Sequence, residues 1–342
     1  MLKNATSLIC TAIVCAISAC ATAELGFADQ ADVDGAAADA PTWRLAIHGG
    51  AGVILRENLT DEQEAAYHAA LEEALKAGAA VLSEGGTALD AVEAAILPME
   101  DNPLFNAGVG AVYTEAGDHE LDASIMNGAD RDAGAVAGVK RVRNPILAAR
   151  AVMEESPHVM FAGVGADAFA AAAGLETVEN THFDTDSRRA ALERVLESRA
   201  RTSADNSGTV GAVAIDMNGT VAAGTSTGGM TAKAAGRIGD APLIGSATYA
   251  QDGVCAVSAT GHGEYFIRVG VAKTICARAE YLGESVEAAA ENALGQVAEL
   301  GGDGGVVLMD GTGTVSYVFN SPGMYRGSID ATGHETAIYG DE

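Results

Sequence analysis

The sequence predicts a layered α/β or α+β body in which helices cover packed β-sheets. Short apolar runs typical of buried strands recur in both halves of the chain, and longer segments with helical periodicity lie between them. The 342 residues are 48% hydrophobic, which is enough to bury a core and excludes a disordered chain. The 42 glycines indicate many tight turns or close backbone contacts.

The first half of the chain supplies strands and helices in turn. Residues 43–47 are predicted to form a strand that runs into a glycine-rich turn at 48–52, and Thr60 with Gln63 forms a capping box at the start of a long helix. A second, shorter helix begins after Thr87 and should stop at Pro98. The remaining predicted elements are buried strands within 120–140, a helix over 144–155, a strand over 158–161 and an alanine-rich helix after it.

The second half begins after a polar region. Residues 176–208 read as a solvated helix followed by a flexible linker. Strands are predicted over 209–215 and 221–225, joined at Asn218-Gly219, the strongest short hairpin signal. The later predicted elements are a strand over 254–260, helices over 264–282 and 285–299, and a closing hairpin of 306–309 and 314–319 that turns at Asp310-Gly311.

Charge and the N-terminal segment indicate where the protein acts. The chain carries 47 Asp and Glu against 20 Lys and Arg, a formal net charge of −27, which excludes a nucleic-acid partner. Residues 1–23 resemble a signal peptide, with Lys3 ahead of a short apolar stretch and an A-x-A site before Glu24. A lipobox at 17–20 is the alternative, which would end the leader at 19 and lipidate Cys20. We expect an exported, periplasmic protein or lipoprotein, with residues 24–42 as a flexible tether.

Two cysteines, Cys255 and Cys276, remain once the leader is removed. Two thiols cannot form a structural zinc site and are too few for a disulfide framework. A single disulfide between them could form in an oxidising compartment, but we expect two buried free thiols.

Two motifs resemble known sites without the surroundings those sites require. Residues 224–228 match the GxSxG pattern of a hydrolase with Ser226 as nucleophile, but the segment that follows is glycine-broken and polar rather than helical. Residues 163–168 resemble part of a dinucleotide fingerprint, yet no second βαβ unit is evident. We therefore expect neither a serine nucleophile elbow nor a dinucleotide site.

The junction between Gly208 and Thr209 indicates a catalytic nucleophile more strongly than these two motifs do. A flexible polar linker meets a buried strand directly at a threonine. Cleavage before Thr209 would expose a hydroxyl and a free α-amine on one residue, and the amine, with an ordinary pKa of about 7.7–8.0, can activate that hydroxyl without a histidine.

At this point the sequence resembles the plant-type L-asparaginase / isoaspartyl peptidase family of N-terminal nucleophile hydrolases. The matching blocks cover the chain from about 43 to 327 in family order; they are 48–52, 102–114, 119–128, 133–153, 156–163, 208–220, 225–245, 260–268 and 323–327. The resemblance implies an α+β four-layer αββα sandwich. It also implies self-cleavage between Gly208 and Thr209 into an α subunit (43–208) and a β subunit (209–342) of one domain, which pair into a dimer of heterodimers.

The resemblance also assigns the site. It makes Thr209 the nucleophile and Thr227 the hydroxyl that orients it. The further matches are Arg237 and Asp240 for the α-carboxylate and α-amine of the substrate, Thr260 and Gly261 for the oxyanion hole, and Asn106 and Gly50 for supporting roles. No catalytic cofactor is implied.

The resemblance further implies a structural sodium ion, although a simple tight loop would also fit this segment. The carbonyl ligands would come from residues of the loop 99–109, namely Met99, Glu100, Asn102, Phe105, Ala107 and Val109. His262 departs from the small hydroxyl or amide residue that many relatives carry there, so its effect on the pocket is open.

The implied activity is hydrolysis of β-aspartyl dipeptides and L-asparagine, releasing L-aspartate. A glycosylasparaginase is the alternative within the same fold, although residues 226–233 fit the asparaginase branch better. An uncleaved, inactive binding protein of the cell envelope is the alternative from another class.

Overall fold

The computed structural model describes residues 43–198 and 208–342. The predicted leader with Cys20, the tether and residues 199–207 of the linker lie outside the described residues. The described residues belong to one compact unit, whose larger sheet takes strands from both sides of the Gly208–Thr209 junction.

The larger sheet has eight strands in the order β12-β11-β1-β5-β6-β2-β3-β4. The strands before the junction are β1 (Arg44–Gly52), β2 (Leu121–Asn127), β3 (Ala133–Val139) and β4 (Met160–Ala162); those after it are β5 (Val210–Ile215), β6 (Val221–Thr227), β11 (Gly323–Asp330) and β12 (Gly333–Tyr339). All neighbouring pairs are antiparallel except β3 and β4. The strand that begins after the junction, β5, therefore lies between β1 and β6 in the interior of the sheet.

The smaller sheet has four antiparallel strands in the order β10-β9-β8-β7. Its strands are β7 (Thr248–Gln251), β8 (Cys255–Gly261), β9 (Gly304–Asp310) and β10 (Val315–Phe319). This sheet packs on the larger one, with β8 against β5 and β6 and with β9 against β1.

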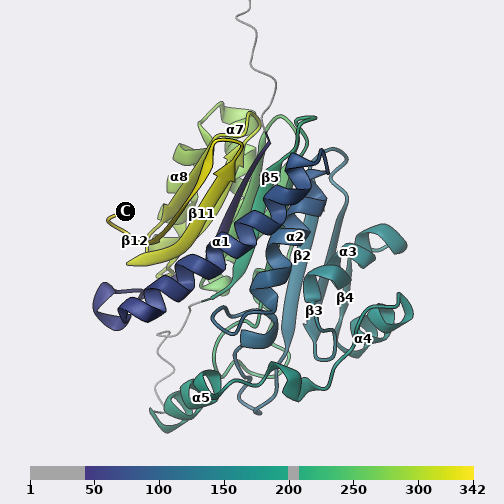
Figure 1. The fold of residues 1–342 in the computed structure, drawn as a ribbon, viewed down its shortest axis with the longest axis vertical. Coiled ribbons are helices and arrows are strands. Elements are labelled where there is room, and N and C mark those ends of the chain that lie inside the picture. Colours follow the sequence, from purple (N-terminus) through teal and green to yellow (C-terminus); the bar gives the residue numbers. More distant parts are fainter. Residues whose placement is uncertain (1–42, 199–207) are drawn as a thin grey trace, which may run out of the picture. The chain divides into compact units, whose positions relative to one another are not determined.

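Helices cover the outer face of each sheet, as Figure 1 shows. The larger sheet is covered by α1 (Asp61–Ser83), α2 (Ala88–Glu100), α3 (Pro145–Glu155) and α4 (Gly163–Ala172), and the smaller one by α7 (Val271–Leu282) and α8 (Val286–Glu299). Two further helices are α5 (Asp186–Ser198) and α6 (Gly263–Val269), of which α6 contacts α7 and α8. The predicted four-layer αββα sandwich is confirmed.

Strands β1 and β5 are mostly small and apolar because both faces of the larger sheet are buried there. Along β1, Leu45 and Ile47 join the core beneath the helices, while Ala46 between them joins the core between the sheets. Along β5, Ala212 joins the core beneath the helices and Val213 joins the core between the sheets. Such strands read as continuous small and apolar runs rather than as alternation with polar residues.

The helix starts follow their local signals. Thr60 accepts from the backbone N–H of Gln63, whose side chain accepts from the backbone N–H of Thr60, so the predicted capping box is present. Thr87 caps α2 by accepting from the backbone N–H of Asp90 at 3.1 Å. Pro98 does not end this helix, which continues to Glu100, because Met99 and Glu100 are buried and tertiary packing outweighs the local preference.

Three boundaries differ from the predicted ones. Strand β1 continues through the expected glycine-rich turn, with a bulge between His48 and Gly50. The helix predicted over 264–282 is divided into α6 and α7 at Gly270, whose φ of 63° ends α6 in a left-handed conformation. The hairpin β9–β10 does not close the fold, because β11 and β12 follow it and complete the larger sheet beside β1.

The expectation of free thiols is wrong, since a disulfide joins Cys255 and Cys276. Cys255 begins β8 and Cys276 lies on the inner face of α7, so the covering helix brings the two side chains together. The bridge links α7 covalently to the smaller sheet.

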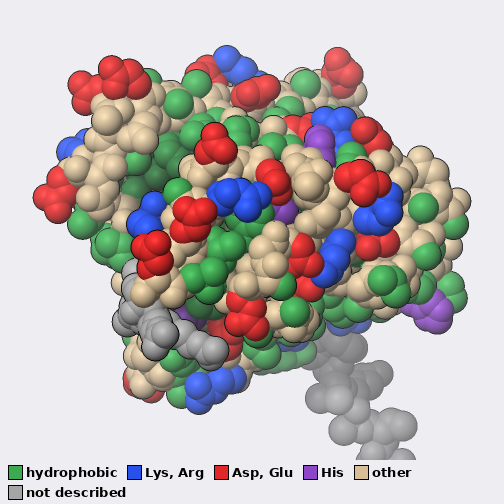
Figure 2. Space-filling model, turned by 90° about the horizontal axis from the view of Figure 1, so that it is seen from below, with side chains coloured by type: hydrophobic (Ala, Val, Ile, Leu, Met, Phe, Trp, Pro, Cys, Tyr) green, Lys and Arg blue, Asp and Glu red, His purple; other side chains and the backbone are tan. Residues whose placement is uncertain are grey.

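Acidic side chains outnumber basic ones on the face that Figure 2 shows. Figure 2 shows them spread over the visible face, with fewer Lys and Arg between them. Within the described ranges, no helix combines the length and the apolar character needed to cross a bilayer.

Candidate active site

The Gly208–Thr209 peptide lies at the start of β5, against the bulge in β1. A Cβ on Gly50 would lie 2.5 Å from the nitrogen of Gly208, and Gly50 has a φ of +116°. A Cβ on Gly208, whose φ is +135°, would lie 2.3 Å from the Cβ of Asn106. Both positions therefore require glycine, and backbone from β1 lies directly against the peptide.

The hydroxyl of Thr209 has a neighbouring hydroxyl as partner. Thr209 Oγ1 lies 2.9 Å from Thr227 Oγ1 at the end of β6. Thr227 Oγ1 also accepts from the backbone N–H of Gly229 at 3.0 Å. Because that bond uses an acceptor site of Thr227, the Thr227 hydroxyl proton is free to point toward Thr209.

Asn106 contacts the peptide through its backbone and holds the adjoining loop through its side chain. Its N–H donates to the carbonyl oxygen of Gly208 at 3.0 Å. Its Nδ2 donates to the carbonyl of Gly229 at 2.7 Å, and its Oδ1 accepts from the N–H of Val112. A hydrogen-bond donor is thus directed at the carbonyl that a Thr209 attack would convert to an oxyanion.

His48 is a contact that the sequence reasoning did not assign. Its Nδ1 lies 3.0 Å from the carbonyl oxygen of Thr209, and its ring is fully buried. Burial lowers the pKa of the imidazole to about 3, so the ring is neutral at ordinary pH. Its place in the block 48–52 was visible in the sequence, but its partner became evident only in the folded chain.

Thr260 and Gly261 lie at the end of β8, on the other side of the same bulge. Thr260 Oγ1 accepts from the N–H of Ala51 at 3.3 Å, one residue from Gly50. Gly261 has a φ of +149°, and a Cβ there would lie 2.5 Å from the carbonyl oxygen of Asp303. The predicted oxyanion pair and the predicted nucleophile thus border the same short stretch of β1.

Arg237 and Asp240 lie together next to this region. A Cβ on Gly263 would come within 3.0 Å of both Arg237 Nη2 and Asp240 Oδ1, and Gly263 follows Gly261 by two residues. Arg237 forms a two-bond ion pair with Glu264, through Nε and Nη2 at 2.9 Å each. Its Nη1 lies near Gly229, since a Cβ on Gly229 would be 3.3 Å from it. The N–H of Gly229 is the group that donates to Thr227.

Asp240 is nearly buried, and its Oδ2 has no hydrogen-bond partner among the described residues. Burial raises the pKa of this carboxyl to about 7. The arrangement provides one guanidinium and one carboxylate side by side, which suits a zwitterionic α-amino acid group. The sequence reasoning did not include Glu264, which holds the guanidinium in place.

The loop 99–109 gathers backbone carbonyls around two glycines. A Cβ on Gly108 would lie 2.1 Å from the carbonyl oxygen of Glu100, and one on Gly110 would lie 2.0 Å from that of Phe105. The carbonyls of Met99, Asn102 and Ala107 each accept a backbone N–H, whereas those of Phe105 and Val109 accept none from the described residues. Neutral carbonyl oxygens suit a monovalent hard cation, so the loop fits the implied sodium ion.

Other candidates lie elsewhere or are engaged. Ser226 is buried and donates to Glu100 Oε1 at 2.6 Å, which agrees with its exclusion as a nucleophile. His262 is the residue before α6, with its Nδ1 3.9 Å from Asp303 Oδ1 and its ring edge-on to Tyr265. In the described part of the chain, no cluster of three His, Cys, Asp or Glu side chains could hold a metal ion.

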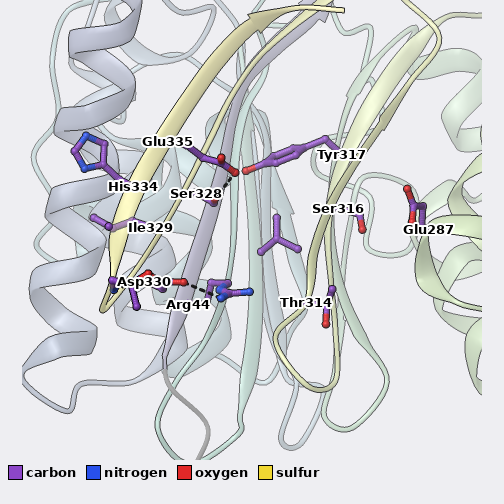
Figure 3. A pocket seen from close by; sticks show the side chains of 13 residues that line it. Arg44, Glu287, Thr314, Ser316, Tyr317, Ser328, Ile329, Asp330, His334 and Glu335 are labelled. Carbon is purple, nitrogen blue, oxygen red and sulfur yellow. Dashed lines mark hydrogen bonds and ion pairs between the residues drawn. The ribbon is translucent and has the colours of Figure 1, made fainter. Parts of the chain in front are cut away.

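A separate hollow of about 800 Å³ lies between β10, the β11–β12 hairpin and α8. Figure 3 shows Tyr317 reaching across it toward Ser328 and Glu335. Arg44 and Asp330 form an ion pair in it at 2.7 Å, and Ser328 donates to Glu335 at 3.2 Å. Its lining includes none of the candidate site residues.

Comparison with known proteins shows what the chain as a whole is similar to. The family described as Asparaginase matches residues 41–338. The isoaspartyl peptidase of Salmonella typhimurium is 49% identical over 295 residues, covering 82% of this chain and 93% of its own length. The Escherichia coli isoaspartyl peptidase is 48% identical over 295 residues, with coverage of 82% and 91%. The human isoaspartyl peptidase/L-asparaginase is 41% identical over 274 residues, with coverage of 79% and 87%.

Proposed function

Because this chain belongs to the asparaginase family, we propose that it hydrolyses β-aspartyl dipeptides and L-asparagine with an N-terminal threonine that it exposes by self-cleavage. The observation that carries this proposal is the arrangement at the junction. Thr209 Oγ1 lies 2.9 Å from Thr227 Oγ1, and the carbonyl of Gly208 accepts from Asn106 N–H at 3.0 Å.

In self-cleavage, Thr209 Oγ1 attacks the carbonyl carbon of Gly208. The N–H of Asn106 stabilises the negative charge that develops on the carbonyl oxygen. The C–N bond then breaks, the hydroxyl proton passes to the departing nitrogen, and an ester joins Gly208 to Thr209. Water hydrolyses this ester, which leaves a carboxylate on Gly208 and a free amine on Thr209.

In substrate hydrolysis the same hydroxyl attacks the β-amide carbon. The free amine of Thr209 takes the hydroxyl proton and delivers it to the leaving amine, while Thr227 orients the hydroxyl. The hydroxyl of Thr260 and the N–H of Gly261 would stabilise the tetrahedral oxyanion. Water then releases L-aspartate from the acyl-enzyme and restores Thr209.

Arg237 and Asp240 would hold the aspartyl moiety by its α-carboxylate and α-amine. Glu264 occupies Nε and Nη2 of the guanidinium, so Nη1 is the atom offered to the substrate carboxylate. The unpartnered Oδ2 of Asp240 would accept from the ammonium. Both contacts require free α-groups, so the substrate class is a β-linked aspartyl compound rather than an internal aspartyl residue.

The proposal extends to the association of the subunits, to a bound sodium ion and to the location of the protein. The two products of cleavage would remain together, since each contributes four strands to the larger sheet, and the heterodimers would pair. A sodium ion in the loop 99–109 would stiffen the backbone that carries Asn106. Export to the periplasm agrees with the disulfide between Cys255 and Cys276, because such bridges persist in oxidising compartments.

The test uses the chain expressed from Glu24. We expect two fragments, 24–208 and 209–342, and turnover of β-aspartyl-leucine; Thr209→Ala should abolish both cleavage and turnover. An intact chain after long incubation would refute the mechanism and favour an uncleaved binding protein. Faster turnover of a glycosylated asparagine than of β-aspartyl-leucine would assign the chain to the glycosylasparaginases instead.

A further inference from the structure

Thr209 lies just beyond the regular hydrogen bonding of its own strand. The pairing of β5 with β1 ends at Gly211 opposite His48, and its pairing with β6 ends at Val210 opposite Ser226. Once the Gly208–Thr209 bond is cut, the preceding peptide no longer restrains Thr209. The contact between His48 Nδ1 and the Thr209 carbonyl at 3.0 Å is then a main restraint on its backbone.

The protonation of His48 follows from its partners. A carbonyl oxygen can only accept, so Nδ1 must carry the proton that bonds Thr209. The buried ring is neutral, so its Nε2 is an acceptor, and the neighbouring donor is the hydroxyl of Ser258 at 2.9 Å.

Ser258 belongs to a buried series of hydroxyls. Ser258 Oγ lies 2.7 Å from Thr225 Oγ1, which lies 2.7 Å from Thr248 Oγ1. All three residues are fully buried between the two sheets. Thr225 can donate to Ser258, whose single hydroxyl proton has two acceptors within reach, His48 Nε2 at 2.9 Å and the carbonyl oxygen of Gly224 at 3.0 Å. The tautomer with its proton on Nδ1 therefore follows from the Thr209 carbonyl, which can only accept, and not from the hydroxyl series.

The sheet leaves room for this contact at Gly211. A Cβ there would lie 2.4 Å from His48 Nε2 and 2.0 Å from Ser258 Oγ. Because Gly211 has no side chain, His48 of β1 and Ser258 of β8 can contact each other across β5.

We propose that His48 is a positioning residue for the nucleophile, fixing the backbone of Thr209 through its Nδ1–H while Ser258 contacts the opposite ring nitrogen. The proposal rests on the proposed function, because it assigns His48 to the threonine that performs both reactions. Since it acts on the placement of Thr209, His48 should affect self-cleavage and kcat rather than substrate binding.

Two substitutions of His48 distinguish the role of Nδ1 from that of Nε2. His48→Asn places an amide N–H near the position of Nδ1, whereas His48→Gln places its amide near the position of Nε2. We expect His48→Asn to cleave itself and to retain most of the wild-type kcat on β-aspartyl-leucine. His48→Gln should lose about tenfold in kcat, with KM nearly unchanged and slower self-cleavage.

The control is His68→Asn, because His68 on α1 bonds Thr336 at 2.7 Å in a contact away from the nucleophile. Equal kcat in the two His48 variants, beside an active wild type, would overturn the positioning role alone. A wild type that cannot hydrolyse β-aspartyl-leucine would refute the proposed function instead. If neither His48 variant folds, Ser258→Ala decides: a lower kcat at unchanged KM supports the proposal, and an unchanged kcat refutes it.

Discussion

Substitution of Gly50 by alanine should uncouple folding from self-cleavage. The new Cβ would lie 2.5 Å from the nitrogen and 2.6 Å from the Cα of Gly208, whereas ordinary contact begins at 3.4 Å. The strand and the junction must therefore separate by about 1 Å, and a misplacement of that size costs about 10²-fold in rate. We expect Gly50→Ala to fold and to cleave itself about a hundredfold more slowly than the wild type.

The matched control is Gly85→Ala. Gly85 has a φ of +83° but open space where its Cβ would lie, so it shares the backbone strain without the contact. A denaturing gel would follow conversion of the precursor into fragments of roughly 19 and 13 kDa, scaled by length from 34.4 kDa for 342 residues. Thermal unfolding would confirm that both variants are folded. Equal cleavage rates in Gly50→Ala and Gly85→Ala would refute the reasoning.

The remaining predictions concern the substrate anchor and the bridge. Arg237→Lys should leave self-cleavage intact but lower kcat/KM on β-aspartyl-leucine by about one to two decades, since a single ammonium nitrogen cannot reproduce the planar guanidinium that bonds Glu264 through two nitrogens and offers a third to the substrate. A normal kcat/KM in the processed variant would contradict the assignment. Because burial raises the pKa of Asp240 to about 7, its carboxylate forms as the pH rises through that value, so inhibition by L-aspartate should strengthen from about pH 6 to 8. Asp240→Asn should remove that dependence, and a variant that kept it would exclude Asp240 as its source. Replacing Cys255 and Cys276 together by serine should cost about 3 kcal/mol for a loop of this length, measured as a lower Tm by calorimetry; an unchanged Tm would argue against the bridge.

Local signals determined many elements of this protein. The capping box at Thr60 and the Asn218-Gly219 turn each act within a few residues, so their structures followed directly from the sequence. The junction at Gly208–Thr209 was visible for the same reason, because a polar linker meets a buried strand there. Assignment of the other site residues required the resemblance, since nothing local distinguishes Thr227 or Asp240 from ordinary loop and strand residues.

The tertiary structure decided what depends on contacts between distant segments. Cys255 and Cys276 form a bridge because α7 packs on β8, and neither residue signals that packing by itself. His48 acquires a partner only when β1 pairs with β5 and β8 packs over both, with 161 residues separating it from Thr209. Strand β1 persists through its glycines because β11 supplies hydrogen bonds from the far end of the chain. Sequence periodicity reports burial along one segment, whereas these features depend on which segments meet.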